Sequence, residues 1–174
     1  MEANATTWVV LGLLALRRMS GYEMKRVVDH STRFFWAASY GQLYPELRRL
    51  EGLGLVSGES EPTGARPRRV FTLTPEGRQA LHGWLRGSET RMETRDESLL
   101  RLFFADCLPR DEAVQLLRAR ADHHRASLAE LEATAAAADA DPPFVSLTLR
   151  YGLDYCRWEV DWCEAREREL REDT

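Results

Sequence analysis

The chain has 174 residues, of which 44% are hydrophobic and 30% charged, and this composition is typical of a folded globular protein. Its longest apolar run, Trp8 to Leu16, is far shorter than the ~20 residues that a membrane-spanning helix needs, so we expect no membrane partner. Glu2 precedes this run where a signal peptide carries basic residues, so we do not expect residues 1–30 to be a signal peptide. Three widely spaced cysteines favour a reducing cytoplasm over a disulfide framework.

The two halves of the chain differ in charge. Residues 1–88 carry 12 Lys and Arg against 8 Asp and Glu, a net +4, whereas residues 89–174 carry 12 against 20, a net −8. A basic front half and an acidic back half indicate that one part meets a polyanion and the other repels it.

The first 30 residues predict two helices. Residues 7–16 form a compact apolar segment that we expect to be a buried helix, capped by Thr6 or Thr7. Ser20 and Glu23 have the spacing of a capping box, in which each side chain accepts from a backbone N–H of the other residue, so a second helix is expected to begin there.

A third helix is predicted from the stretch FWAASYGQLYPELRRLEGLGLV, residues 35–56. Ser39 and Gln42 repeat the capping-box spacing, and Leu43, Leu47, Leu50 and Leu53 follow at helical intervals. Gly54 is placed to end this helix.

The pattern then changes to strands. Leu55–Val56 and Arg69–Thr74 are typical of the two strands of a β-hairpin with a long polar tip. Thr74 as N-cap with Pro75 in the first helical position predicts a fourth helix. Three helices, a hairpin and a helix are the order of a winged helix-turn-helix, which we assign to residues 1–88.

Residues 89–174 are expected to be helical, so the predicted fold is mainly α with a small β-hairpin wing. Asp111–Glu132 and Phe144–Arg171 both have apolar residues at helical spacing. The second of these helices has a first seam and, beside it, an aromatic second row. The first seam consists of Leu149, Leu153, Cys156, Val160 and Cys163, and the aromatic row of Tyr151, Tyr155, Trp158 and Trp162. So wide an apolar band fits either a core helix with an extra layer or a homodimer interface, and we assign dimerisation through the first seam to this half.

The start of the third helix is the main candidate for contact with double-stranded DNA. In a helix-turn-helix, the second helix of the pair puts its N-terminal residues into the major groove. Those residues here are Ser39, Tyr40, Gly41, Gln42 and Tyr44. Gln pairs with adenine, Ser bonds to bases or phosphates, and Tyr donates to phosphates. Gly41 lies four residues before Pro45 and so relieves the clash of the proline ring with the preceding turn, although a kinked core helix fits this spacing nearly as well.

The hairpin tip carries a second candidate group. Arg66, Arg68 and Arg69 are suited to phosphates or to a narrow minor groove, although they could also balance the acidic residues of a solvated turn. Lys25 and Arg48 are further candidates for contact with the DNA backbone.

Three stretches together resemble the PadR family of transcriptional regulators. They are LGLLALRRMSGYEMKRVV, FWAASYGQLYPELRRLEGLGLV and GARPRRVFTLTPEGRQALHGWL, and weaker similarity continues in LLRLFFADCLPRDEAVQLL and LRYGLDYCRWEVDWCE. The resemblance implies a homodimeric winged helix-turn-helix repressor that dimerises through C-terminal helices and binds inverted-repeat operators. It further implies that Ser39–Tyr44 and the Arg66–Arg69 wing touch DNA. A small-molecule inducer is common in the family, and the aromatic residues of this chain would suit a small aromatic or hydrophobic one.

Other classes of function have less support. The four histidines lie in unrelated contexts and no motif of a hydrolase, zinc protease or nucleotide-binding enzyme is present, so we expect no catalysis, metal or cofactor. Cys156 and Cys163 could cross-link two subunits, but small core residues are the simpler interpretation. A winged-helix module that contacts protein instead of DNA remains an alternative.

Overall fold

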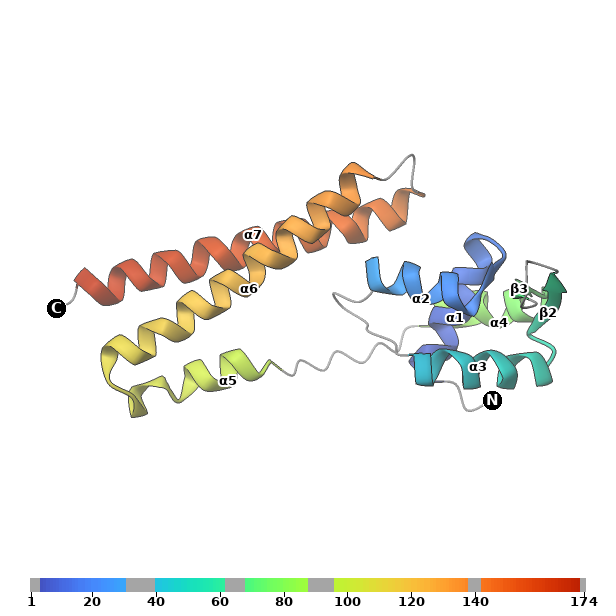
Figure 1. Cartoon of the computed structure of the whole chain (residues 1–174), viewed down its shortest axis with the longest axis horizontal. Coiled ribbons are helices and arrows are strands. Elements are labelled where there is room, and N and C mark those ends of the chain that lie inside the picture. Colours follow the sequence, from blue (N-terminus) through green and yellow to red (C-terminus); the bar gives the residue numbers. More distant parts are fainter. Residues whose placement is uncertain (1–3, 31–39, 62–67, 88–95, 138–141, 173–174) are drawn as a thin grey trace. The chain divides into compact units, whose positions relative to one another are not determined.

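The computed structural model describes residues 4–30, 40–61, 68–87, 96–137 and 142–172, without the side chains of His30 and Tyr40. The chain divides into two compact units, Met1–Arg91 and Met92–Thr174. The described part of the first unit contains four helices and a small antiparallel sheet, and that of the second is entirely helical (Figure 1). The predicted fold class, mainly α with a β wing, is confirmed.

Helix α1, Ala5–Leu16, is the buried helix that the apolar segment predicts. Its cap is different from the one expected, because Asn4 is the N-cap. The Asn4 side chain accepts from the Thr7 N–H, and the Thr7 hydroxyl accepts from the Asn4 N–H. Thr7 therefore belongs to the capping box as its third helical residue and does not begin the helix.

The structure confirms the predicted start of helix α2, Gly21–His30, and the predicted end of helix α3, Tyr40–Gly52. The Glu23 carboxylate accepts from the Ser20 N–H at 2.8 Å, as the capping box requires. Gly54 has a positive φ of 69°, a conformation that glycine adopts without strain. Its N–H donates to the Glu51 carbonyl and the Leu55 N–H donates to the Leu50 carbonyl, so the last carbonyls of α3 are satisfied.

The sheet has three strands in the order β1-β3-β2, all antiparallel. Strands β2, Val56–Glu61, and β3, Arg68–Leu73, form the predicted hairpin, but β2 is longer than expected, because residues 57–61, assigned to the polar tip, pair with β3. Strand β1, Met19–Ser20, was not predicted, because two residues are too short for any alternation to show. Helix α4, Pro75–Arg86, begins as predicted, with the Thr74 hydroxyl accepting from the Gly77 N–H at 3.0 Å.

The core of the first unit lies between the helices and the sheet. Helix α1 contacts α3, α4 and β3, and α3 contacts α2 and β2. The apolar side chains of this core that have no exposed surface at all are Val10, Leu11, Met24, Val28, Leu43, Leu47 and Leu50. These residues come from α1, α2 and α3, so the inner face of each of these helices is fixed by apolar packing.

The second unit is built on two long helices, α6, Arg110–Ala136, and α7, Pro143–Glu172. They run side by side in opposite directions, and the short helix α5, Glu97–Phe103, lies against α6 (Figure 1). A 3-10 turn, η2, at Ala105–Cys107 connects α5 to α6. None of the helices in the described part of the chain could span a membrane.

Candidate nucleic-acid interface

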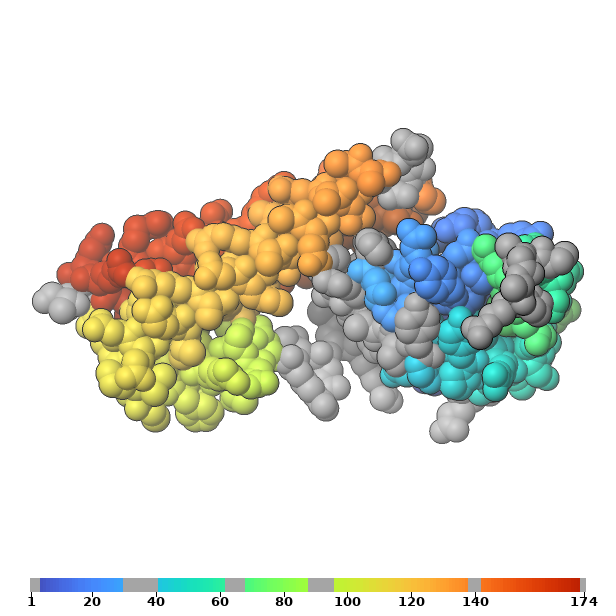
Figure 2. Space-filling model, viewed as in Figure 1, coloured from blue at the N-terminus to red at the C-terminus, as the bar shows by residue number. Residues whose placement is uncertain are grey.

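Helix α3 separates its apolar and polar residues onto two faces. The side chains of Leu43, Leu47 and Leu50 are fully buried. The residues of the other face are exposed, and they are Gly41, Gln42, Tyr44, Pro45 and Arg48. In the space-filling view, α3 lies on the surface of its unit (Figure 2). The outer face therefore contains every predicted contact of this helix whose side chain is described.

Gly41 and Pro45 both lie on this outer face, beside a surface hollow of about 410 Å³. The hollow is also lined by Gln42 and by the residues that begin α1. Pro45 lies inside the helix, four residues after Gly41, and a proline ring crowds the carbonyl of the residue four positions before it. Gly41 and Pro45 are both exposed, so the pair lies outside the buried seam of α3.

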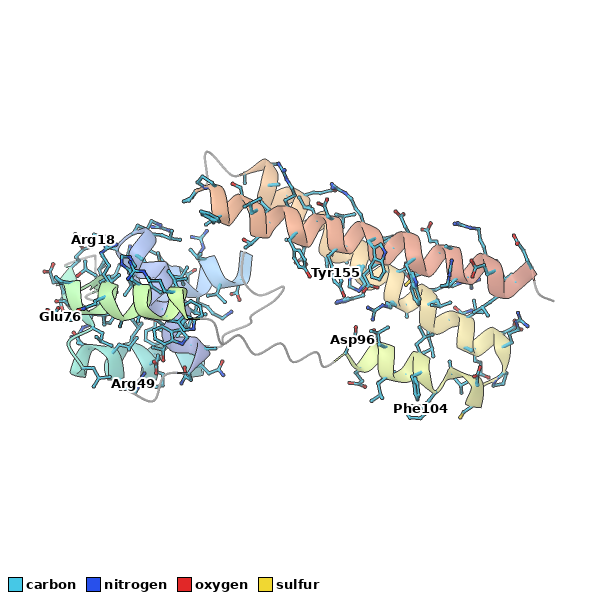
Figure 3. All side chains as sticks on the ribbon, turned by 180° about the vertical axis from the view of Figure 1, so that it is seen from behind. Arg18, Arg49, Glu76, Asp96, Phe104 and Tyr155 are labelled. Atoms are coloured by element: carbon cyan, nitrogen blue, oxygen red, sulfur yellow. The ribbon has the colours of Figure 1, made fainter. Side chains whose placement is uncertain are left out.

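A buried carboxylate fixes α3 against α1. Glu46 is 6% exposed, and its Oε1 accepts from the Thr7 hydroxyl at 2.6 Å. The Arg49 guanidinium donates to both Glu46 oxygens, at 2.6 and 2.9 Å. The hydrogen bonds from Arg49 outweigh the effect of burial and lower the pKa of Glu46. Glu46 thus stays charged, and its bond with Thr7 links α3 to α1 (Arg49 is labelled in Figure 3).

Both described wing arginines lie in ion pairs with carboxylates of the helix-turn-helix, which the sequence did not predict. Arg68 pairs with Glu23 on α2, and Arg69 pairs with Glu51 on α3 at 2.6 Å. Arg68 and the Ser20 N–H together lower the pKa of Glu23 to about 2, the Ser20 bond being the larger cause. Arg18 also pairs with Glu61, the last residue of β2. The hairpin is therefore tied to the helices at several points.

The remaining predicted contacts of this unit are placed as follows. Lys25 pairs with Asp29 one turn further along α2, and its side chain is only 16% exposed. None of the ion pairs found among the described residues involves Arg48, which is exposed. Tyr40 begins α3, and its side chain lies outside the described residues, as do Ser39 and Arg66.

Two residues of the predicted dimerisation seam on α7 are buried within the chain itself. Cys156 and Cys163 are 4% and 1% exposed, and Cys163 packs against Leu117 and Ala121 of α6. Side chains already covered by their own chain cannot form an exposed surface for a partner. Both are free thiols whose pKa is raised by burial, which fits the core interpretation. Leu149, Leu153 and Val160, the other residues of the seam, are half-buried.

The second row of α7 is the exposed one. The rings of Tyr151 and Tyr155 stack at 6.2 Å, and Trp158 follows at 6.3 Å from Tyr155. Tyr151 is 68% exposed and Trp158 is 56% exposed, so this row is open to solvent within the chain. Trp162, the fourth residue of the aromatic row, is half-buried and packs against the core of Leu117, Ala121 and Cys163.

A buried polar network under this row was missed from the sequence. Arg120 of α6 donates to both oxygens of Glu159 on α7, at 2.5 and 2.7 Å, and to Asp96 at 2.7 Å. Tyr155 donates to Glu159 at 2.7 Å, and burial followed by this bond raises its pKa to about 12 (Figure 3 labels Asp96 and Tyr155). The sequence signal was a charged residue within an apolar helical seam. Arg120 lies three residues after Leu117, and Glu159 lies three residues after Cys156.

Comparison with known proteins decides the family. Residues 10–83 match the model of the transcriptional regulator PadR-like family, and residues 94–171 match that of the virulence activator alpha C-terminal region. The chain is 31% identical over 169 residues to the negative transcriptional regulator PadR of Bacillus subtilis, with 91% of this chain and 93% of that protein covered. The chain belongs to the PadR-like family of transcriptional regulators.

Solved structures of PadR-like proteins match the chain over nearly its whole length. The structure of B. subtilis PadR in complex with operator DNA has a TM-score of 0.86 and 28% identity, covering 96% of this chain and 99% of that one. The virulence activator AphA of Vibrio cholerae has a TM-score of 0.75 and 25% identity, covering 98% and 100%. The family is one of regulators and not of enzymes, and the described residues contain no cluster suited to a metal ion.

Proposed function

We propose that this PadR-family chain binds double-stranded DNA in a sequence-specific way and represses transcription as a homodimer on an inverted-repeat operator. The observation that carries the proposal is the likeness to B. subtilis PadR bound to operator DNA, over 96% of the chain. That protein is a negative regulator, which supports repression here. Residues 1–88 would bind DNA, and residues 89–174 would hold the dimer.

The exposed face of α3 supports the DNA-binding part of the proposal. Gln42 can pair with an adenine in the major groove, and Tyr44 and Arg48 can reach phosphates. Ser39, Tyr40, Gly41 and Lys25 remain proposed contacts, as do the wing arginines Arg66 and Arg68. Arg68 would reach phosphate only by exchanging its present carboxylate partner.

The aromatic row of α7 supports the dimer. Large exposed rings in a continuous row are typical of a protein interface, because burying them removes apolar surface from water. A second copy that covers this row would hold the two α3 helices at a fixed separation. For successive major grooves on one side of B-DNA, that separation is ~34 Å.

Release by a small molecule is proposed by analogy with one solved relative. B. subtilis PadR has been solved in complex with p-coumaric acid, with a TM-score of 0.78 and 27% identity to this chain. A small aromatic or hydrophobic inducer would release the operator only if it bound the DNA-free form more tightly than the bound form.

The test is selection of binding sites from a random duplex library, followed by titration of the selected duplex at increasing salt. We expect a palindromic site and an affinity that falls steeply with salt, because phosphate contacts release counterions. Absence of duplex binding even at low salt would favour the alternative, a winged-helix module that contacts protein. Titration of the complex with p-coumaric acid then tests release.

A further inference from the structure

We propose that Glu51 is a positioning residue for DNA binding, which clamps the wing to the end of α3 through Gly58 and Arg69. These three residues are called the wing clamp below. The inference rests on the DNA-binding function proposed above. It gives Arg69 a role inside the protein in place of the predicted phosphate contact.

One carboxylate oxygen makes the clamp. Oε1 of Glu51, in the last turn of α3, accepts from the Gly58 N–H of β2 at 3.0 Å. The same oxygen accepts from Nη2 of Arg69 on β3 at 2.6 Å. A single atom of α3 is therefore bonded to both strands of the hairpin, and its charge strengthens both bonds. Because α3 carries the proposed base contacts, the clamp sets where the wing lies relative to them.

Gly58 is what allows the carboxylate to come so close. A Cβ built on Gly58 would lie 2.7 Å from Glu51 Oε1, 2.7 Å from Arg69 Nε and 2.8 Å from a ring carbon of Phe71. Real Cβ atoms essentially never come this close to other atoms, so Glu51, Arg69 and the Phe71 ring would all have to shift. Glycine at this strand position therefore leaves the room that Glu51 and Arg69 occupy over the backbone of β2.

Arg69 is held on a second side as well. Its guanidinium carbon lies 5.7 Å from the centre of the Phe71 ring, within the range of a cation–π contact. Phe71 is opposite Gly58 in the β2–β3 register and is 5% exposed, so it is a fixed part of the core. To bind a phosphate, Arg69 would have to give up its bond with Glu51 and its contact with Phe71, and an unpaired arginine would lose neither.

The clamp makes a distinctive prediction for salt dependence. Each lysine or arginine that neutralises a DNA phosphate contributes about 0.9 to the slope of log affinity against log salt concentration. A positioning arginine contributes nothing to that slope. Replacing Arg69 should therefore weaken binding while the slope stays as in the wild type, whereas the loss of a phosphate contact would lower both.

The experiment uses the full chain and its selected duplex, with Glu51→Ala, Glu51→Gln, Arg69→Ala and the double variant Glu51→Ala/Arg69→Ala. The control is Glu59→Gln, which removes the same charge from an exposed position of β2 next to Gly58. We expect E51A and R69A to lose roughly tenfold in affinity relative to E59Q, the scale of one charge-assisted bond. E51Q should lie between E59Q and E51A, because its amide oxygen still accepts from Gly58.

The double variant separates a clamp from two independent contacts. If Glu51 and Arg69 act only through each other, the DNA affinity of E51A/R69A should be no lower than that of whichever single variant binds DNA more weakly. Additive losses, a slope that falls by about 0.9 in R69A, or E51A and E51Q that bind as E59Q does would overturn the inference. Equal thermal unfolding midpoints confirm that each variant is folded.

A readout without DNA keeps this result separate from that of the proposed function. Hydrogen exchange of the Gly58 amide should be faster in E51A than in the wild type and unchanged in E59Q. If the wild type bound no duplex, the proposed function would fail while the exchange result still tested the clamp. If the wild type bound DNA and the Gly58 amide exchanged equally in E51A, the clamp alone would fail.

Discussion

Arg120 and Glu159 face each other across α6 and α7 with side chains only 3% and 4% exposed, and they pair through two hydrogen bonds of 2.5 and 2.7 Å. Asp96, which also caps α5, takes a further hydrogen of Arg120 at 2.7 Å. The hydrogen bonds that Arg120 donates to Glu159 outweigh burial and raise the pKa of Arg120 above its already high value. One guanidinium thus joins α6, α7 and the N-cap of α5.

Removing one partner of this pair should strongly destabilise the chain. Glu159→Gln leaves the Arg120 charge buried without full compensation, so we expect a loss of about 3–5 kcal/mol in the free energy of unfolding. Urea unfolding followed by circular dichroism measures it. The control is Glu132→Gln, which breaks the exposed pair of Glu132 with Arg157 and should cost about 0–1 kcal/mol. Equal losses in both variants would contradict the importance of the buried pair.

The Glu23–Arg68 pair predicts a pH dependence of stability. The pKa of Glu23 is lowered from 4.5 to about 2 in the folded chain, chiefly by the Ser20 N–H and then by Arg68. A lowered pKa contributes stability that is fully present above 4.5 and is lost as pH falls toward 2. We therefore expect the difference in unfolding free energy between the wild type and Glu23→Gln to be largest above pH 5 and to shrink toward pH 2. A difference that does not change over that range would show that this carboxylate is not perturbed.

The outer face of α3 should separate specificity from general affinity. Gln42→Ala should relax the preference at one base pair of the selected site by about 1–3 kcal/mol, because an amide reads a base edge. Arg48→Ala should weaken binding to all sequences alike and lower the salt slope by about 0.9, as the loss of a phosphate contact does. Titrations of the selected duplex and of single-base variants measure both effects. If the two variants behaved alike, the assignment of base and phosphate contacts would be wrong.

A side chain at position 58 should reproduce the loss of the wing clamp. Gly58→Ala puts a Cβ 2.7 Å from Glu51 Oε1, so the carboxylate and Arg69 must shift. We expect DNA affinity to fall to about the level of E51A, on the order of tenfold below the wild type. Gly83→Ala on α4 is the control, since its Cβ would meet nothing within 4 Å. Wild-type affinity in G58A would show that Glu51 tolerates displacement.

The aromatic row should decide the oligomeric state. Trp158→Arg places a charge in the proposed subunit interface, so we expect a monomer at low micromolar concentration in sedimentation velocity. Trp158→Phe keeps an apolar ring at the same exposed position and should stay dimeric. A dimer that survives in W158R would show that the second copy covers another surface.

Features encoded by neighbouring residues could be predicted well. The Ser20–Glu23 box, the end of α3 at Gly54 and the start of α4 at Thr74 and Pro75 all depend on groups within four residues of each other. The N-cap of α1 was wrong by a few residues, since Asn4 and Thr7 form a box that uses an asparagine and a threonine. The exposed outer face of α3 could also be predicted, because the helical period determines which residues share a face.

What the sequence by itself determined is helices α1 to α4, α6 and α7, the hairpin and the exposed face of α3, because the local backbone and the apolar period decide these. Only the tertiary structure decided which charges are paired. Glu51 and Arg69 are 18 residues apart in the sequence, and Arg120 and Glu159 are 39 residues apart. The same packing placed Cys163 inside the chain and left Trp158 outside. The physical reason is that a charge or a ring finds its partner through the packing of distant elements, which no local spacing records.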